Sequence, residues 1–185
     1  MTDNIVRGSL SQIAKDEHKS IAQTFLNCDA IILVDTSGSM SSCDSRGGKS
    51  RYKVACEELA SLQNNMPGKL AVIAFSNDVL FCPSGIPFDF GNSTIMEKAL
   101  NYVYVADNIP GMKFILISDG APDNEGKTLA AARKFKNHID TIYVGPETES
   151  SGKDFLARLA KISGGQSVQD FRVKELQSSV QKLLS

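Results

Sequence analysis

The stretch that decides the fold is AIILVDTSGS, residues 30–39. Its run of apolar residues predicts a strand buried inside a sheet, and the polar residues that follow predict a loop at the strand's carboxyl end. In an open α/β sheet, ligands bind in the crevice beyond the carboxyl ends of the strands. Asp35, Ser37 and Ser39 are therefore candidate ligand-binding residues.

Outward from this stretch, apolar runs alternate with segments of helical periodicity, a pattern typical of βα units. Strands are expected at residues 29–35, 70–75, 79–81, 113–117, 141–144 and 166–168, and helices at about 52–66, 94–103, 129–135, 155–163 and 173–183. The short run 79–81 follows a polar turn, which predicts a hairpin and an antiparallel edge strand. The expected fold class is α/β, with a central, mostly parallel six-stranded sheet and helices on both faces.

The chain divides into two expected parts. Residues 3–26 carry Leu10, Ile13 and Ile21 on one stripe, which predicts an amphipathic helix within a segment of residues 1–27. That segment either packs on the domain or docks another subunit. Residues 28–185 are the α/β domain itself, because a chain of 185 residues is long enough for one well-buried core.

Composition excludes several classes of function. The 20 basic and 21 acidic residues give a net charge of −1, which argues against nucleic-acid binding by the whole molecule. No stretch approaches the ~20 apolar residues of a membrane span, and no signal peptide is apparent. The 4 cysteines are scattered without a CxxC pair, so they predict reduced thiols and no zinc site. We expect a cytoplasmic protein.

A second carboxylate is expected beside the first. Asp119 directly follows the strand at 113–117, as Asp35 follows its own strand, and Thr94 opens the helix at 94–103. Each carboxylate alone could cap a helix, and each hydroxyl could satisfy turn amides. Two uncompensated carboxylates across one crevice are unfavourable without a cation between them, and hard cations such as Mg²⁺ prefer oxygen ligands. The set therefore predicts a metal site.

These residues together resemble the metal-ion-dependent adhesion site of a von Willebrand factor type A (vWA) domain. Its signature is D-x-S-x-S, a distant Thr and a later Asp, matched here by Asp35, Ser37, Ser39, Thr94 and Asp119. The resemblance runs from about Cys28 to the end of the chain and includes residues 116–122 and 159–165. It points to a stand-alone intracellular member of prokaryotic type with a Rossmann-like fold and a complete site.

The resemblance also implies how the site works. Ser37 and Ser39 would bind Mg²⁺ directly, Thr94 directly or through water, and Asp35 and Asp119 largely through waters. Mn²⁺ or Ca²⁺ could substitute. An open position on the ion would then accept a Glu or Asp carboxylate from a partner protein.

Two features depart from the family pattern. Ser93 precedes Thr94 and could be mistaken for the ligand, although the spacing along the sequence to the following helix favours Thr94 as the ligand. The loop at 41–49 is longer than usual, and four cations lie in it or just beyond it, at Arg46, Lys49, Arg51 and Lys53. They are either a solvated loop and helix start, the favoured interpretation, or a frame around the metal that attracts an acidic ligand.

Enzymatic alternatives are weaker. Gly48-Lys49-Ser50 is similar to part of a phosphate-binding loop, but Cys43 stands where that motif requires glycine. His18 and His138 lie away from the serines, so no general base serves a hydrolase. The sequence thus predicts a non-enzymatic, metal-dependent protein-interaction module. The alternative is a regulatory or adaptor subunit of an AAA+ ATPase or metal-chelatase-type complex, and a metal-dependent hydrolase is less favoured.

Overall fold

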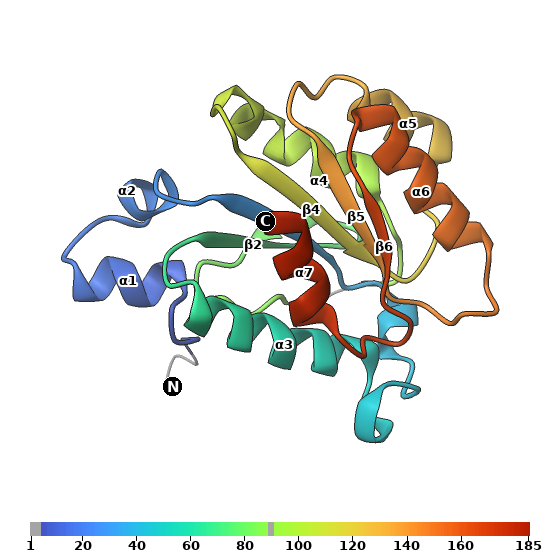
Figure 1. Ribbon diagram of the computed structural model, residues 1–185, viewed down its shortest axis with the longest axis horizontal. Helices are drawn as coiled ribbons and strands as arrows, with labels where there is room; N and C mark the ends of the chain where they lie inside the picture. Colours follow the sequence, from blue (N-terminus) through green and yellow to red (C-terminus); the bar gives the residue numbers. More distant parts are fainter. Residues whose placement is uncertain (1–4, 89–90) are drawn as a thin grey trace.

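A six-stranded sheet with the strand order β3-β2-β1-β4-β5-β6 forms the centre of the molecule (Figure 1). The computed structural model describes residues 5–88 and 91–185. The strands are β1 (Ala30–Asp35), β2 (Leu70–Phe75), β3 (Val79–Phe81), β4 (Lys113–Ser118), β5 (Ile139–Tyr143) and β6 (Ser167–Gln169). Only the β2–β3 pair is antiparallel among these strands. The predicted fold class is confirmed.

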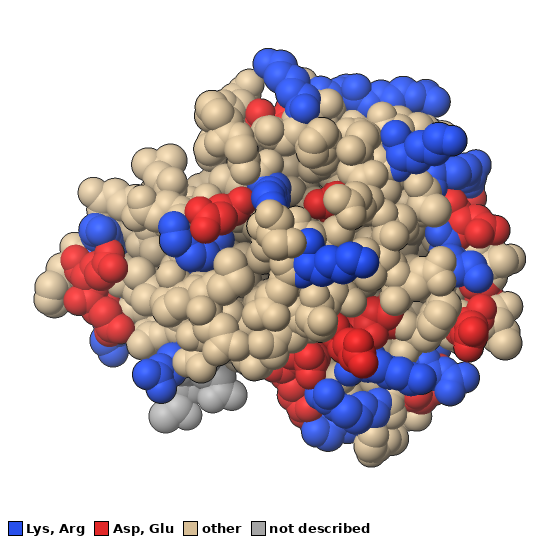
Figure 2. All heavy atoms as spheres, viewed as in Figure 1, with Lys and Arg blue, Asp and Glu red and all other residues tan. Residues whose placement is uncertain are grey.

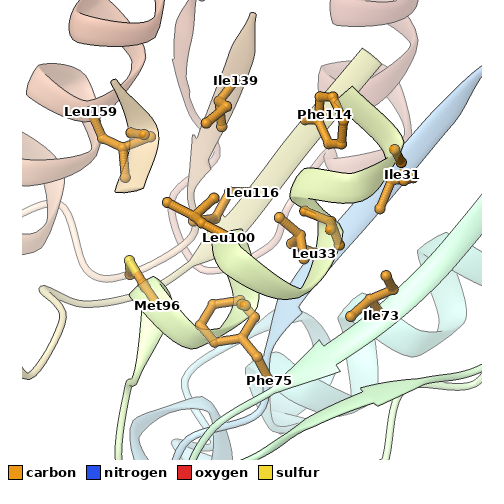
Figure 3. Close-up of a cluster of buried hydrophobic side chains, with 14 of the residues drawn as sticks. Ile31, Leu33, Ile73, Phe75, Met96, Leu100, Phe114, Leu116, Ile139 and Leu159 are labelled. Carbon is orange, nitrogen blue, oxygen red and sulfur yellow. The ribbon is translucent and has the colours of Figure 1, made fainter. Parts of the chain in front are cut away.

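Both faces of the sheet are buried under helices, and each strand contributes to both because successive side chains point to opposite faces. In β1, Ile31 and Leu33 belong to one apolar cluster, whereas Ile32 and Val34 belong to another. The first cluster, shown in Figure 3, is covered by α4 (Met96–Val103), α5 (Glu125–Ala132) and α6 (Ser151–Ser163). The second is covered by α3 (Arg51–Asn65) and α7 (Leu176–Leu184), which lie on one side of the sheet in Figure 1.

The carboxyl edge of the sheet is where the predicted site residues meet. β1 and β4 are parallel neighbours, with Val34 opposite Ile117. Asp35 ends β1 and Asp119 follows β4, so the two carboxylates share this edge as expected. A short 3-10 turn, η1 (Gly38–Ser41), follows β1 and carries Ser39.

The prediction of one helix over residues 3–26 is wrong. Two short helices form instead, α1 (Leu10–Asp16) and α2 (Ile21–Phe25), with residues 1–4 outside the described part. His18 takes a left-handed backbone (φ 54°), and a capping box between Ser20 and Gln23 starts the second helix. The expected helix is therefore interrupted between α1 and α2.

The segment lies against the domain. The carbonyl of Gly8 accepts the Gly68 N–H at 2.9 Å, and Leu10 is 1% exposed within the first apolar cluster.

Helix ends differ from the expected bounds where side chains or strained backbone intervene. The last helix begins at Leu176 rather than 173, because Arg172 and Val173 have left-handed φ values of 63° and 56°. Asp170 holds this turn by accepting the N–H groups of Lys174 and Glu175. Helix α6 ends at Gly164, which has a left-handed backbone with φ of 81°.

Charges of both signs are mixed over the face shown in Figure 2. Near the 41–49 loop, Arg46 pairs with Glu58 at 2.6 Å and Lys49 with Glu57 at 2.8 Å. The cysteines at 28, 43, 56 and 82 form no disulfide within the described residues, and Cys28 is buried. In the described part of the chain, no helix is long and apolar enough to cross a membrane.

Candidate metal centre

Asp35 organises the loop at the end of β1. Its carboxylate is fully buried, and Oδ1 accepts the backbone N–H of Ser37 at 2.8 Å. Oδ2 accepts the hydroxyl of Ser118 at 2.6 Å, so Asp35 also joins β1 to β4. Sequence reasoning did not assign Ser118 a role, although its position next to Asp119 at a strand end was a usable signal.

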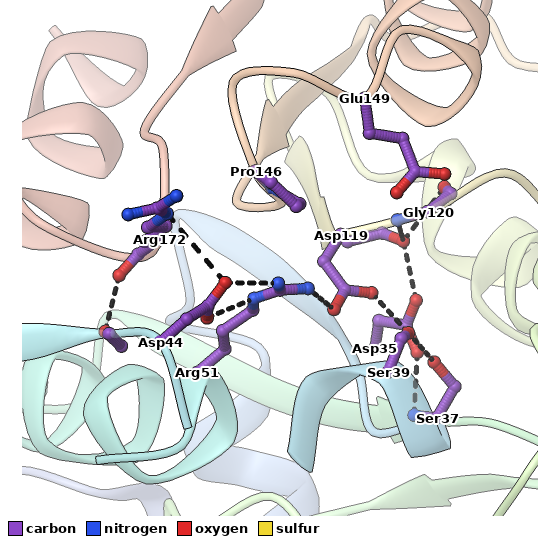
Figure 4. A network of polar contacts seen from close by, with 12 residues as sticks. Asp35, Ser37, Ser39, Asp44, Arg51, Asp119, Gly120, Pro146, Glu149 and Arg172 are labelled. Atoms are coloured by element: carbon purple, nitrogen blue, oxygen red, sulfur yellow. Dashed lines mark hydrogen bonds and ion pairs between the residues drawn. The ribbon is translucent and has the colours of Figure 1, made fainter. Parts of the chain in front are cut away.

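A chain of hydroxyls connects the two halves of the site (Figure 4). Ser37 Oγ and Ser39 Oγ are 3.1 Å apart, and Ser39 Oγ donates to Asp119 Oδ1 at 2.6 Å. Ser37 and Asp119 are each 2% exposed, whereas Ser39 is exposed. The structure thus brings four of the five predicted residues together, and the cluster opens to solvent at Ser39.

Thr94 lies on the same edge, but within the described residues it forms no hydrogen bond with the other four. Its backbone N–H donates to Asp123 Oδ1 at 3.2 Å, and its carbonyl accepts the Asp123 N–H at 3.0 Å. Its hydroxyl forms no hydrogen bond within residues 5–88 and 91–185. A Cβ added at Gly38 would lie 3.6 Å from Asn92 Oδ1, so the loop before Thr94 lies near the serine loop. Thr94 therefore offers a free hydroxyl beside the cluster.

The contacts of Arg51 differ from two expectations drawn from the sequence. Its guanidinium donates to Asp119 Oδ2 at 2.6 Å and to both carboxylate oxygens of Asp44, at 2.8 and 2.6 Å. Its side chain is only 7% exposed, so the prediction of a solvated cation is wrong for Arg51. The assumption that both carboxylates are uncompensated is also wrong, because Asp119 has this partner. Asp44 was missed, since no periodic or motif signal marks it in the 41–49 loop.

The electrostatics of Asp35 differ from those of Asp119. Burial raises the pKa of Asp35 to about 6, and the nearby charge of Asp119 also raises it, against the lowering effect of hydrogen bonds from Ser118 and Ser37. Because this folded-state pKa lies above the unfolded value of about 3.9, the metal-free fold is stabilised at low pH. That stabilisation is lost as pH rises through about 6. At neutral pH, Asp35 is thus a buried charge without a cationic partner among the described residues.

The donor set fits a hard divalent cation. Octahedral coordination at about 2.0 to 2.1 Å places neighbouring ligand oxygens about 2.9 Å apart. The Ser37–Ser39 and Ser39–Asp119 oxygen separations of 3.1 and 2.6 Å bracket that spacing. Nowhere in the described residues do three or more His, Cys, Asp or Glu side chains form a metal-binding group. An ion here would depend on hydroxyl oxygens together with carboxylates, a chemistry suited to Mg²⁺ rather than zinc.

Comparisons with known proteins support the architecture. No protein-family model matches the chain, and no curated protein matches it by sequence. An aerotolerance-related membrane protein from Bacteroides fragilis is similar in structure, with a TM-score of 0.63 and 17% identity over 84% of this chain and 97% of that chain. Proximal thread matrix protein 1 from the mussel byssus has a TM-score of 0.64 and 19% identity over 85% of this chain.

The chain spans 47% of the mussel protein. The SpRpn10 VWA domain is similar with a TM-score of 0.59 and 12% identity, over 82% of this chain and 92% of that domain. At these identities the likeness is one of fold. Together with the parallel sheet and its single antiparallel edge strand, it shows that the chain has the fold of a vWA domain.

Proposed function

We propose that the chain is a protein-interaction module that depends on a divalent metal, and that its five predicted residues form a complete adhesion site for Mg²⁺. The observation that carries the proposal is the buried Asp35 carboxylate, which is connected through Ser37 and Ser39 to Asp119 and has no cationic partner in the part of the chain that the structure describes. A fold shared with the SpRpn10 VWA domain supports it. The expectations of a stand-alone protein in the cytoplasm stay predictions.

The residues of the proposed site have different roles. Asp35 fixes the serine loop by binding the Ser37 amide, and the hydroxyls of Ser37, Ser39 and Thr94 with Asp119 Oδ1 would hold the ion. When bound, Mg²⁺, or Mn²⁺ or Ca²⁺ in its place, supplies a position that accepts a Glu or Asp carboxylate from a partner. The exposed side of Ser39 is where that carboxylate would arrive.

The module is proposed to be non-enzymatic. No histidine takes part in the hydrogen bonds or ion pairs of the described site, and Lys49 of the Gly48-Lys49-Ser50 stretch is bound to Glu57. Phosphatase and ATPase assays of the purified chain test this. Turnover that is abolished both by EDTA and by Asp35→Asn would contradict the proposal.

Thr94→Ala and Ser93→Ala form a matched pair that tests the function. Thr94→Ala is expected to weaken Mn²⁺ binding by about 10-fold or more and to abolish metal-dependent capture of a partner, because it removes the free hydroxyl beside the cluster. Ser93→Ala leaves the Ser93 carbonyl that accepts the Ser76 hydroxyl at 2.7 Å, so its binding should match wild type. Calorimetric titration, and capture in Mg²⁺ with elution by EDTA, measure both. Equal binding by the two variants would remove Thr94 from the site.

Metal affinity is expected to depend on pH through Asp35. Because the pKa of Asp35 is about 6 in the metal-free protein, lowering the pH from about 7 to about 5 protonates it. Protons then compete with the cation, and Mn²⁺ affinity should fall about tenfold over this interval. Titrations at the two pH values in metal-free buffers check this. A change smaller than about twofold would mean that the charge of Asp35 does not support the ion.

A further inference from the structure

The contact between Arg51 and Asp119 is the most deeply buried ion pair among the described residues of the carboxyl edge. The two side chains are 7% and 0% exposed, and their nearest atoms are 2.6 Å apart. Figure 4 shows the guanidinium between Asp44 and Asp119, at the end of the polar chain that begins at Asp35. The two oxygens of the Asp119 carboxylate therefore have different partners. Oδ2 accepts a hydrogen bond from Arg51, and Oδ1 accepts one from the hydroxyl of Ser39.

The two candidate carboxylates are consequently in different electrostatic states. Asp119 is paired with a guanidinium, whereas the hydrogen bonds to Asp35 come from the Ser37 amide and the Ser118 hydroxyl. Within residues 5–88 and 91–185, Arg51 is the one Lys or Arg that contacts a predicted metal ligand. Asp44 fixes Arg51 from the other side through two hydrogen bonds, so the cation is held in place.

We propose that Arg51 is a built-in counter-ion of the site, which supplies positive charge to Asp119 in the metal-free protein and thereby lowers the affinity for a divalent ion. The inference rests on the proposed function. A buried carboxylate left alone is costly, and the charge of Arg51 offsets part of that cost at Asp119. The same guanidinium repels an incoming cation, since both share one carboxylate. The occupied site then keeps more positive charge, which favours an anionic partner over metal alone.

The test compares two substitutions at Arg51 with a matched arginine elsewhere. Arg51→Gln removes the charge, and Arg51→Lys keeps the charge but loses the planar fork that reaches both carboxylates. Arg46→Gln is the control, because Arg46 pairs with Glu58 and has an exposed fraction of 53%. Mn²⁺ affinity is measured by calorimetry or paramagnetic resonance, and thermal unfolding is followed in EDTA and in Mn²⁺.

The expected pattern separates charge from positioning. Arg51→Gln should unfold at a lower temperature in EDTA yet bind Mn²⁺ about tenfold more tightly than wild type, so metal should raise its melting temperature further. Arg51→Lys should bind Mn²⁺ within about threefold of wild type, and Arg46→Gln should be unchanged. Weaker binding by both Arg51 variants would overturn the proposal, because Arg51 would then only position Asp119.

The test remains informative if Arg51→Gln fails to fold without metal. If Arg51→Gln does not fold in EDTA, Mn²⁺ should restore its fold by supplying the missing positive charge; failure in both conditions overturns the proposal. Failure of the metal function is a separate result. If wild type binds metal and Arg51→Gln binds it equally or more weakly, the counter-ion proposal is rejected but the proposed function is not. Binding by Arg51→Gln but not by wild type supports the counter-ion, and binding by neither rejects both proposals.

Discussion

Asp35→Asn is expected to weaken metal binding by about 100-fold or more while making the metal-free protein more stable at pH 7. The asparagine can keep the local structure, because Oδ1 can accept the Ser37 N–H and Nδ2 can donate to Ser118 Oγ. Ser118 can then turn its hydroxyl toward the Gly120 carbonyl, 3.3 Å away. What disappears is the negative charge, which is needed by the cation and is unfavourable in its absence.

The size of the stability gain follows from proton linkage. The pKa of Asp35 is raised to about 6 by burial, about two pH units above the unfolded value. Ionising it in the fold therefore costs about 3 kcal/mol by pH 7, and most of this should be recovered in Asp35→Asn. The gain should vanish below about pH 4, where the wild-type carboxyl is protonated in both states. Urea unfolding in EDTA across this range measures it.

A matched control isolates the buried charge. Asp78→Asn removes a carboxylate near the same sheet edge, but Asp78 is exposed and pairs with Lys98 on the surface. It should change neither metal affinity nor stability by more than small amounts. Metal affinity in Asp35→Asn is expected to fall by about 100-fold or more. If Asp35→Asn is instead less stable at pH 7 and binds metal normally, Asp35 is a structural cap and the metal proposal fails.

The sequence predicted those parts of the molecule that depend on short patterns. Apolar runs located β1 to β5, and the polar turn at 76–78 placed the antiparallel edge. The D-x-S-x-S stretch and Asp119 came together because parallel strands bring their carboxyl ends to one edge. These features need only the local period and the order of the elements.

The sequence could not predict contacts that depend on where long side chains reach. Arg51 lies 68 positions from Asp119 along the chain, and its path to that carboxylate depends on how α3 packs on the sheet. Asp44 lies in a loop without a period, so nothing marked it as the second partner of Arg51. The break between α1 and α2 depends on the backbone of His18, a non-glycine residue for which a left-handed conformation is uncommon.

Gly8→Ala is expected to destabilise the protein strongly, although residue 8 is far from the candidate site in sequence. Gly8 has φ of 82°, and an added Cβ would lie 2.0 Å from the Gln63 carbonyl oxygen and 2.6 Å from its carbon. These are backbone atoms of α3, so no rotamer change relieves the clash. Left-handed strain and the clash together should cost about 2 to 4 kcal/mol, or a drop of about 5 to 15 °C in melting temperature.

Gly111→Ala is the matched control for this change. Gly111 has a similar φ of 78°, but an added Cβ would meet no atom within 4 Å, so only the backbone strain of about 1 kcal/mol applies. Thermal unfolding of both variants compares strain with close packing. A larger loss for Gly8→Ala means that the N-terminal segment is packed into the fold through α3 and the Gly68–Gly8 hydrogen bond. Equal losses mean that the segment yields without cost to the domain, as a docking segment for another subunit would.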